Sequence, residues 1–319
     1  MGTSVAAVIS YYRNRWNEES EPEVRDMPYA LIFAFVLPAA RFILDKSVFE
    51  ILARRFVRSK AIWKKDDSLT SDKGSPAAID REALLKTHSK YKESLWKIAY
   101  YLSSCIFCFF VTFGEPWLTD TKYYWIGPGS KVWPDQMAKL KAKVLFGYFA
   151  GFYVYSIFAI LFWETRRKDW LVHLIHHICC VTMSIVCYHF RVFRMAPAVI
   201  GLHDISDVLL EVAKLCLYSK FELGANVSFA LFATTWVMFR LWWFPRNVLY
   251  SFCCESIKYW DLKRYPVLLP RLYYALNFAT IMMIEMHCYW WILICRVLYR
   301  QLVAGRVEGD VRSDEEDDD

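Results

Sequence analysis

The sequence lacks the features that mark secreted proteins, zinc fingers and nucleic-acid-binding proteins. Residues 1–12 have no basic start followed by an apolar core, so no signal peptide is expected there. Ala6 stands where a myristoylation signal needs Ser or Thr. Cys105 and Cys108 form a Cys-x-x-Cys pair without a second pair at zinc-finger spacing. No RNA-binding motif accompanies the basic runs, so no nucleic-acid partner is expected.

Apolar residues are abundant instead. Hydrophobic residues make up 56% of the chain and aromatic residues 18%, whereas apolar usage in a soluble protein is about 45–50%. A soluble protein this apolar would be nearly all core, which the scaling of surface with volume does not permit. The surplus requires an apolar solvent, so the chain is predicted to lie in a membrane.

Six or seven apolar stretches are long enough to cross a bilayer, which takes about 17–25 residues as a helix. Helices are required because lipid cannot satisfy exposed backbone groups. The chain is therefore expected to be an all-α integral membrane protein with a bundle of about seven transmembrane helices. The expected spans are residues 28–44, 96–113, 144–164, 170–188, 196–217, 226–249 and 273–299.

The orientation follows from the loop after the first expected span, which holds the strongest cluster of Lys and Arg. Such loops stay in the cytosol, so the N-terminus is predicted to be lumenal and the C-terminus cytosolic. The chain then divides into a lumenal segment, residues 1–27, a transmembrane catalytic domain, residues 28–300, and an acidic cytosolic tail, residues 301–319. The composition of the tail predicts that it is disordered.

Three histidines on the fourth expected span share one face of the helix. His173, His176 and His177 are separated by three and four residues, which is the spacing of neighbours along a helix surface. A single histidine in a membrane helix often serves as a hydrogen bond between helices. Three within five residues favour a functional site.

The fifth expected span carries a second polar face. Asp204, Asp207, Glu211 and Lys214 follow spacings of three, four and three, and His203 borders them. Each acid at a helix centre costs roughly 2.5–3.5 kcal/mol to insert, so three could cost about 8–10 kcal/mol. Partners or water must therefore reach these groups, and the two polar faces are expected to meet inside the bundle. Glu211 and Lys214 can also form a simple pair within the helix.

The residue types suit acyl transfer from an activated ester. Imidazole can take a proton from an attacking amine near neutral pH or attack an acyl group directly. An aspartate on the other ring nitrogen fixes the tautomer and stabilises imidazolium. We therefore predict that Asp204 and Asp207 orient His176 and His177, and that no metal is needed.

A metal site is the alternative. The sequence HLIHH fits the histidine box of membrane di-iron desaturases and hydroxylases. Those enzymes need several such boxes, whereas this chain has seven histidines in all and one such cluster. A mononuclear zinc site of histidines with Asp204 is a further alternative.

The motifs together resemble a known family. RRKD at 166–169, then the paired histidines, HDISD at 203–207 and LEVAK at 210–214 are similar to the Lag motif of the ceramide synthases in the TLC-domain family. The resemblance extends from about residue 28 to 300, and the acidic tail resembles the plant members. It implies catalytic roles for His176, His177, Asp204 and Asp207.

The resemblance also implies a multi-pass enzyme of the endoplasmic reticulum membrane. Such an enzyme N-acylates sphinganine or phytosphingosine with a fatty acyl-CoA to give ceramide. Its partners are then these two substrates and membrane lipid. It needs no cofactor, and it assembles as a homo- or hetero-dimer. Six further residues are expected to bind substrate. These are Arg166, Arg167 and Lys168, either as phosphate contacts or as topology anchors, and His173, His203 and Glu211.

A protein of this family without enzymatic activity, a lipid sensor or transporter, is a second alternative. Retention of both histidines and both aspartates argues against it. The length of the acyl chain and the preferred sphingoid base are left open by the sequence.

Overall fold

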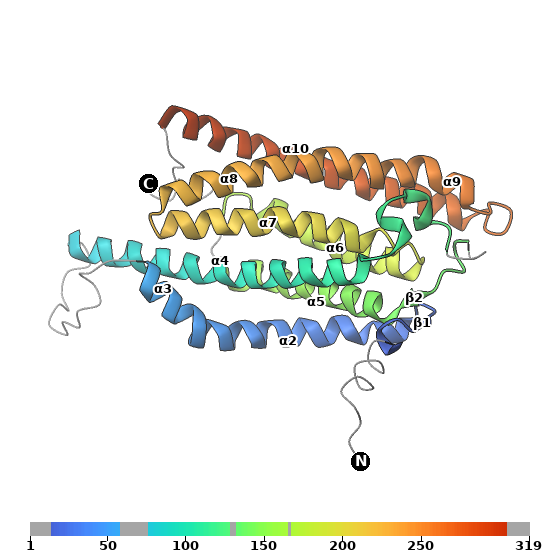
Figure 1. The fold of residues 1–319 in the computed structure, drawn as a ribbon, viewed down its shortest axis with the longest axis horizontal. Helices are drawn as coiled ribbons and strands as arrows, with labels where there is room; N and C mark the ends of the chain where they lie inside the picture. Colours follow the sequence, from blue (N-terminus) through green and yellow to red (C-terminus); the bar gives the residue numbers. More distant parts are fainter. Residues whose placement is uncertain (1–13, 58–75, 128–131, 165–166, 305–319) are drawn as a thin grey trace, which may run out of the picture.

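The computed structural model describes residues 14–57, 76–127, 132–164 and 167–304 of the chain. Long helices lie side by side along one common direction (Figure 1). Within the described residues, six of them are long and apolar enough to cross a membrane, so the prediction of a helical membrane protein is confirmed. They are Val24–Phe56, Arg81–Thr112, Leu140–Phe162, Trp170–His189, Glu222–Tyr259 and Leu268–Val303.

The elements follow one another in a simple order. The long helical segments alternate in direction along the chain when α7 is counted among them, and the two strands lie at one end of the bundle (Figure 1). The elements are β1 (Glu19–Ser20), η1 (Val24–Asp26), α2 (Pro28–Leu44), η2 (Asp45–Phe49), α3 (Glu50–Phe56), α4 (Pro76–Thr112), η3 (Pro116–Leu118), η4 (Thr121–Tyr124), β2 (Ala138–Lys139), α5 (Leu140–Phe162), α6 (Trp170–His189), α7 (Ala196–Tyr218), α8 (Glu222–Trp236), η5 (Val237–Trp243), η6 (Pro245–Leu249), η7 (Ser251–Glu255), α9 (Ser256–Tyr259) and α10 (Leu268–Ala304).

The helix at the fifth expected span differs from the other six in composition. Residues 196–217 were expected to cross the membrane, and α7 forms at this place, but its charges keep it out of the apolar set. Asp204, Glu211 and Lys214 are nevertheless buried. They are buried because α7 lies in the middle of the bundle and packs against α4 and α8 (Figure 1). The polar helix is thus shielded by apolar neighbours.

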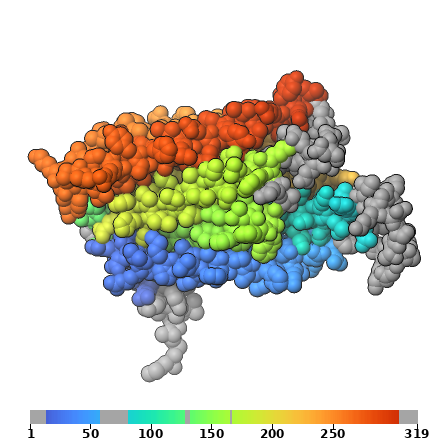
Figure 2. Space-filling model, turned by 180° about the vertical axis from the view of Figure 1, so that it is seen from behind, coloured from blue at the N-terminus to red at the C-terminus, as the bar shows by residue number. Residues whose placement is uncertain are grey.

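Two glycines allow α2 to approach α5 closely. Gly147 and Gly151 stand one turn apart on α5, and a Cβ added to them would lie 2.4 Å from Cβ of Tyr29 and 2.6 Å from Cβ of Phe33. Small residues four apart let helix backbones meet in a membrane, where dispersion forces rather than the hydrophobic effect hold helices together. This contact holds α2 at the edge of the bundle (Figure 1), and Figure 2 shows the same blue segment along that edge from behind.

The long helical segment from Glu222 to Tyr259 contains three π-helical stretches, η5, η6 and η7. Pro245 lies at the start of η6 and has no N–H to donate to the preceding turn. Wider turns of this kind often mark functional sites. Within η5 the side chain of Arg240 turns inward and is only 4% exposed.

An aromatic cap closes the end of the bundle where the two strands and α9 lie (Figure 1). Trp125 and Trp260 pack edge to face with ring centroids 5.6 Å apart, and the indole N–H of Trp125 donates to Ser251 at 2.8 Å. Arg194 ties the cap to the start of α7 by donating to the carbonyls of Tyr123 and Ile126. The buried indoles leave this end of the bundle densely packed.

The contact between α2 and α5 predicts a strong size limit. Replacing Gly151 by Ile should destabilise the protein by about 1–3 kcal/mol, because an overpacked site forces the backbones apart. Thermal unfolding of the purified protein in detergent measures the change. Ala39→Ile adds bulk at an exposed position of α2 and should leave the melting temperature unchanged. Equal stability of the two variants would show that the close contact is dispensable.

Candidate active site

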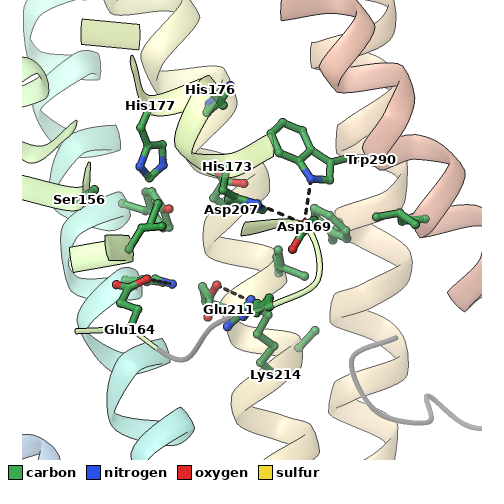
Figure 3. Close-up of a pocket in the computed structure, with 18 of the residues that line it drawn as sticks. Ser156, Glu164, Asp169, His173, His176, His177, Asp207, Glu211, Lys214 and Trp290 are labelled. Atoms are coloured by element: carbon green, nitrogen blue, oxygen red, sulfur yellow. Dashed lines mark hydrogen bonds and ion pairs between the residues drawn. The ribbon is translucent and has the colours of Figure 1, made fainter. Parts of the chain in front are cut away.

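A cavity of about 210 Å³ lies inside the bundle, and side chains from α4, α5, α6, α7, α8, η5 and α10 line it. Figure 3 shows that the two ends of this cavity carry different side chains. His176 and His177 lie at one, and Glu164, Glu211 and Lys214 lie at the other, with His173 between them. We call these the histidine end and the charged end.

The histidine end presents the buried ring of His176 and the partly buried ring of His177. The ring of His177 meets Tyr153 edge to face at 5.0 Å between centroids, and the ring of His176 meets Trp290 at 5.3 Å. Among the described residues, Nδ1 of His176 and Nδ1 of His177 have no hydrogen-bond partner. The thiol of Cys180, one turn further on, lies 3.5 Å from Nε2 of His176. Both rings line the cavity, and neither Nδ1 is engaged by another described residue.

Asp207 lines the cavity but does not pair with a histidine. Its carboxylate accepts a hydrogen bond from the guanidinium of Arg240 at 2.7 Å, and the same nitrogen of Arg240 donates to the carbonyl of His203 at 3.0 Å. The guanidinium also lies 4.1 Å from the centre of the Trp236 ring. The expected pairing of Asp207 with His176 or His177 is thus replaced by an ion pair, because η5 places a stronger partner beside the carboxylate.

Asp204 and His203 lie outside the walls of the cavity. Asp204 is 2% exposed and faces α4 beside Ser104. His203 bonds through Nδ1 to the carbonyl of Val199 at 2.7 Å, and its ring lies 5.0 Å from that of His287 on α10. The expected pairing of Asp204 with the paired histidines is therefore absent from this arrangement. The polar face predicted for α7 is wide enough to point in two directions, toward the cavity and toward α4.

His173 is held by the last carboxylate of the RRKD sequence, for which no role was predicted. Asp169, just before α6, lies 3.2 Å from Nδ1 of His173 and accepts a hydrogen bond from the indole of Trp290 at 3.1 Å. Figure 3 shows both interactions converging on one carboxylate. The predicted pairs of His176 and His177 with Asp204 and Asp207 are not formed, and the histidine–aspartate pair that lines the cavity joins His173 to Asp169.

The charged end is a network of buried ions. Lys97 on α4 pairs with Glu93 at 2.6 Å and with Glu164 at 3.2 Å, and Arg167 pairs with Glu93 at 3.3 Å. Arg167 and Lys97 line the cavity. Glu93 and Lys97 escaped the sequence analysis because they stand at the edge of an otherwise apolar span.

Glu211 and Lys214 complete the charged end. Their side chains form an ion pair of 2.7 Å within α7, and both line the cavity. Lys168 is exposed and is not among the lining residues, and Arg166 lies outside the described residues. Within the described residues, histidines, cysteines and carboxylates do not gather in threes around a point that could hold a metal ion.

The comparisons with known proteins agree with this architecture. Residues 90–296 match the model of the TLC domain, a family that also carries the name TRAM_LAG1_CLN8. These residues cover more than half of the chain, which therefore belongs to the TLC-domain family.

Within that family the chain is similar over nearly its whole length to plant proteins. It is 41% identical to ASC1-like protein 1 of Oryza sativa subsp. japonica, over 100% of this chain and 99% of the relative. It is 41% identical to Ceramide synthase 1 LOH3 and 38% identical to Ceramide synthase LOH2, both of Arabidopsis thaliana. These matches cover 95% and 93% of this chain, and 95% and 94% of the relatives. The resemblance to plant ceramide synthases is thereby confirmed.

The ion pair between Asp207 and Arg240 predicts a specific pattern of stability. Arg240→Gln should destabilise the protein by about 1–3 kcal/mol, because it leaves the carboxylate of Asp207, whose side chain is 21% exposed, without its cation. Adding Asp207→Asn should recover part of that loss, with a coupling energy of about 0.5–3 kcal/mol. Denaturant unfolding of the four proteins measures the cycle. Arg246→Gln, at an exposed position of the same segment, is the matched control, and additive losses would contradict the pairing.

Proposed function

We propose that the chain transfers a fatty acyl group from acyl-CoA to the amine of a sphingoid base, sphinganine or phytosphingosine, and so makes ceramide. The observation that carries the proposal is the histidine end of the cavity. The buried ring of His176 and the partly buried ring of His177 line a space that has ionic groups at one end and aromatic walls around it. Relatives named ceramide synthase along the whole chain support it.

The two ends of the cavity fit the two parts of acyl-CoA. Its phosphates suit Arg167 and the lysines of the charged end, since such cations bind phosphate strongly. Its thioester then reaches the histidine end. Apolar side chains on α8 and α10 offer a surface for hydrocarbon. They are Phe229, Phe232, Leu293, Ile294 and Val297.

The reaction exchanges one bond for another. The amine nitrogen attacks the thioester carbonyl, the new C–N bond forms and the C–S bond breaks, and one proton leaves nitrogen while one joins sulfur. His176 or His177 receives the proton from nitrogen. Arg240 carries Nε without a partner among the described residues and lines the cavity. It supplies positive charge for the oxyanion that develops on the carbonyl, and Asp207 balances that charge in the resting site.

We further propose seven crossings, with a lumenal N-terminus, a cytosolic C-terminus and a location in the endoplasmic reticulum membrane. The 23 residues of α7 span about 34 Å as a helix. The start of α4 and the end of α10 lie at one end of the bundle, and the strands and α9 lie at the other (Figure 1). Because β1 precedes the first long helix at one end and α10 ends at the other, the chain crosses the bundle an odd number of times (Figure 1). The charged end of the cavity then faces cytosolic acyl-CoA.

A purified enzyme tests the proposed chemistry directly. Wild-type protein given a fatty acyl-CoA and sphinganine should form the amide, and His176→Ala or His177→Ala should abolish it while the protein still accumulates in the membrane. The reason is that imidazole is the base of this site near neutral pH. Mass spectrometry of the lipid product measures the rate. His189→Ala, in the last turn of α6, is the matched control and should remain active.

Two outcomes of that experiment favour the alternatives. A hydroxylated or desaturated lipid in place of the amide, formed only when iron or zinc is present, favours a metal-dependent lipid hydroxylase or desaturase. Binding of sphinganine without amide formation favours a lipid sensor or transporter.

The topology predicts different fates for the two termini. An Asn-x-Thr acceptor tag added to the N-terminus should be glycosylated, and an epitope added to the C-terminus should be digested by protease in sealed microsomes. The native sequence Asn226-Val227-Ser228 lies near the cytosolic start of α8 and should stay unmodified. Six crossings would place both tags on the same side, and a glycan on Asn226 would reverse the orientation.

A further inference from the structure

The couple of Asp169 and His173 stands apart from the two histidines that the proposed reaction uses. The carboxylate is almost completely buried, with 1% of its side chain exposed, whereas the imidazole of His173 is 34% exposed and lines the cavity. Asp169 thus lies behind the ring on the side of Nδ1, and the ring faces the cavity. A carboxylate in this position fixes the tautomer of a histidine and stabilises its protonated form.

The position of Asp169 and His173 along the cavity matches the order of the atoms in a bound acyl-CoA. His173 lies between the histidine end and the charged end (Figure 3). Its ring centroid is 6.4 Å from that of His177. In an acyl-CoA whose phosphates lie at the charged end, the sulfur precedes the carbonyl carbon. When the carbonyl is at His176 and His177, the sulfur is therefore on the side of His173.

Trp290 keeps this arrangement in place across two helices. Its indole donates to the same carboxylate oxygen of Asp169 that meets His173, and its ring packs against His173 at 4.9 Å and against His176 at 5.3 Å. One buried carboxylate therefore sets the position of a ring on α6 and of a ring on α10.

From these contacts, and on the basis of the proposed acyl transfer, we propose that His173 is the acid that protonates the leaving sulfur of acyl-CoA and that Asp169 is its positioning residue. The C–S bond breaks, and Nε2 of the protonated His173 gives its proton to the thiolate, so that the thiol leaves. The proton removed from the amine by His176 or His177 then passes to His173 and restores the starting state. No further reactant is needed, because one proton leaves nitrogen for each one that joins sulfur.

The leaving group provides the test. Asp169→Asn and His173→Gln are assayed in the full-length purified protein with two donors of the same fatty acyl group, the CoA thioester and the S-phenyl thioester. Thiophenolate leaves without help from an acid. With acyl-CoA both variants should lose about 10²-fold in kcat, which is the contribution of a positioned acid. With the S-phenyl thioester, each variant should react at a rate close to that of the wild-type protein with the same compound.

Four comparison variants make the result specific. Asp169→Glu keeps the carboxylate and should recover part of the loss on acyl-CoA. Trp290→Phe keeps an aromatic ring but removes the indole N–H that bonds to Asp169. It should change the rate by the same factor with the CoA thioester and with the S-phenyl thioester. His176→Ala should be inactive with either donor. Asp135→Asn changes an aspartate whose side chain is 64% exposed and should match the wild type.

Three results would overturn the proposal. An equal loss on both donors would mean that Asp169 and His173 merely support the structure, and an undiminished rate with acyl-CoA would mean that they are dispensable. In both cases the acyl transfer itself stands. A wild-type protein that makes no amide from either donor would instead remove the proposed function, and this inference with it.

Discussion

The placement of charge inside an apolar bundle is the constraint on which the rest of the structure depends. α7 carries two aspartates, a glutamate and a lysine through a region where each isolated charge costs several kcal/mol. Two of its three acids meet a cation, one from another element and one from α7 itself. Arg240 on η5 neutralises Asp207, and Lys214 neutralises Glu211 within the helix. The π-helical turn, the central position of α7 and the apolar helices around it all serve this one requirement.

The periodicity of the sequence predicted the helices and the faces that meet, but not the partners within them. His173, His176 and His177 do share the wall of one cavity with Asp207 and Glu211, as their spacing indicated. Arg240 was missed because it stands alone in an apolar run, and its inward position depends on a wider helical turn that spacing does not encode. Asp169 was missed because it precedes its helix and bonds to Trp290, which is 121 residues away.

For Asp204 the spacing predicted a partner that the structure does not provide. Its spacing from Asp207 placed both on one helical face, yet that face is broad, and a rotation of a few tens of degrees sends one carboxylate toward α4 and the other toward the cavity. His287 illustrates the same limit, since a histidine that is isolated in the chain lies against His203 in the bundle. Long-range pairs of this kind depend on how helices rotate and slide against one another, which a single sequence leaves open.

The aromatic cap has a consequence for the membrane as well as for the protein. A cavity lined with ions invites water, and a wet passage through the full thickness of a bilayer would let protons and metal ions leak between compartments. The lining residues belong to α4, α5, α6, α7, α8, η5, α10 and the segment between α5 and α6, and they include none of the indoles of the cap. The indoles of Trp125, Trp133 and Trp260 fill the opposite end. The packed indoles therefore separate the ionic cavity from this end of the bundle.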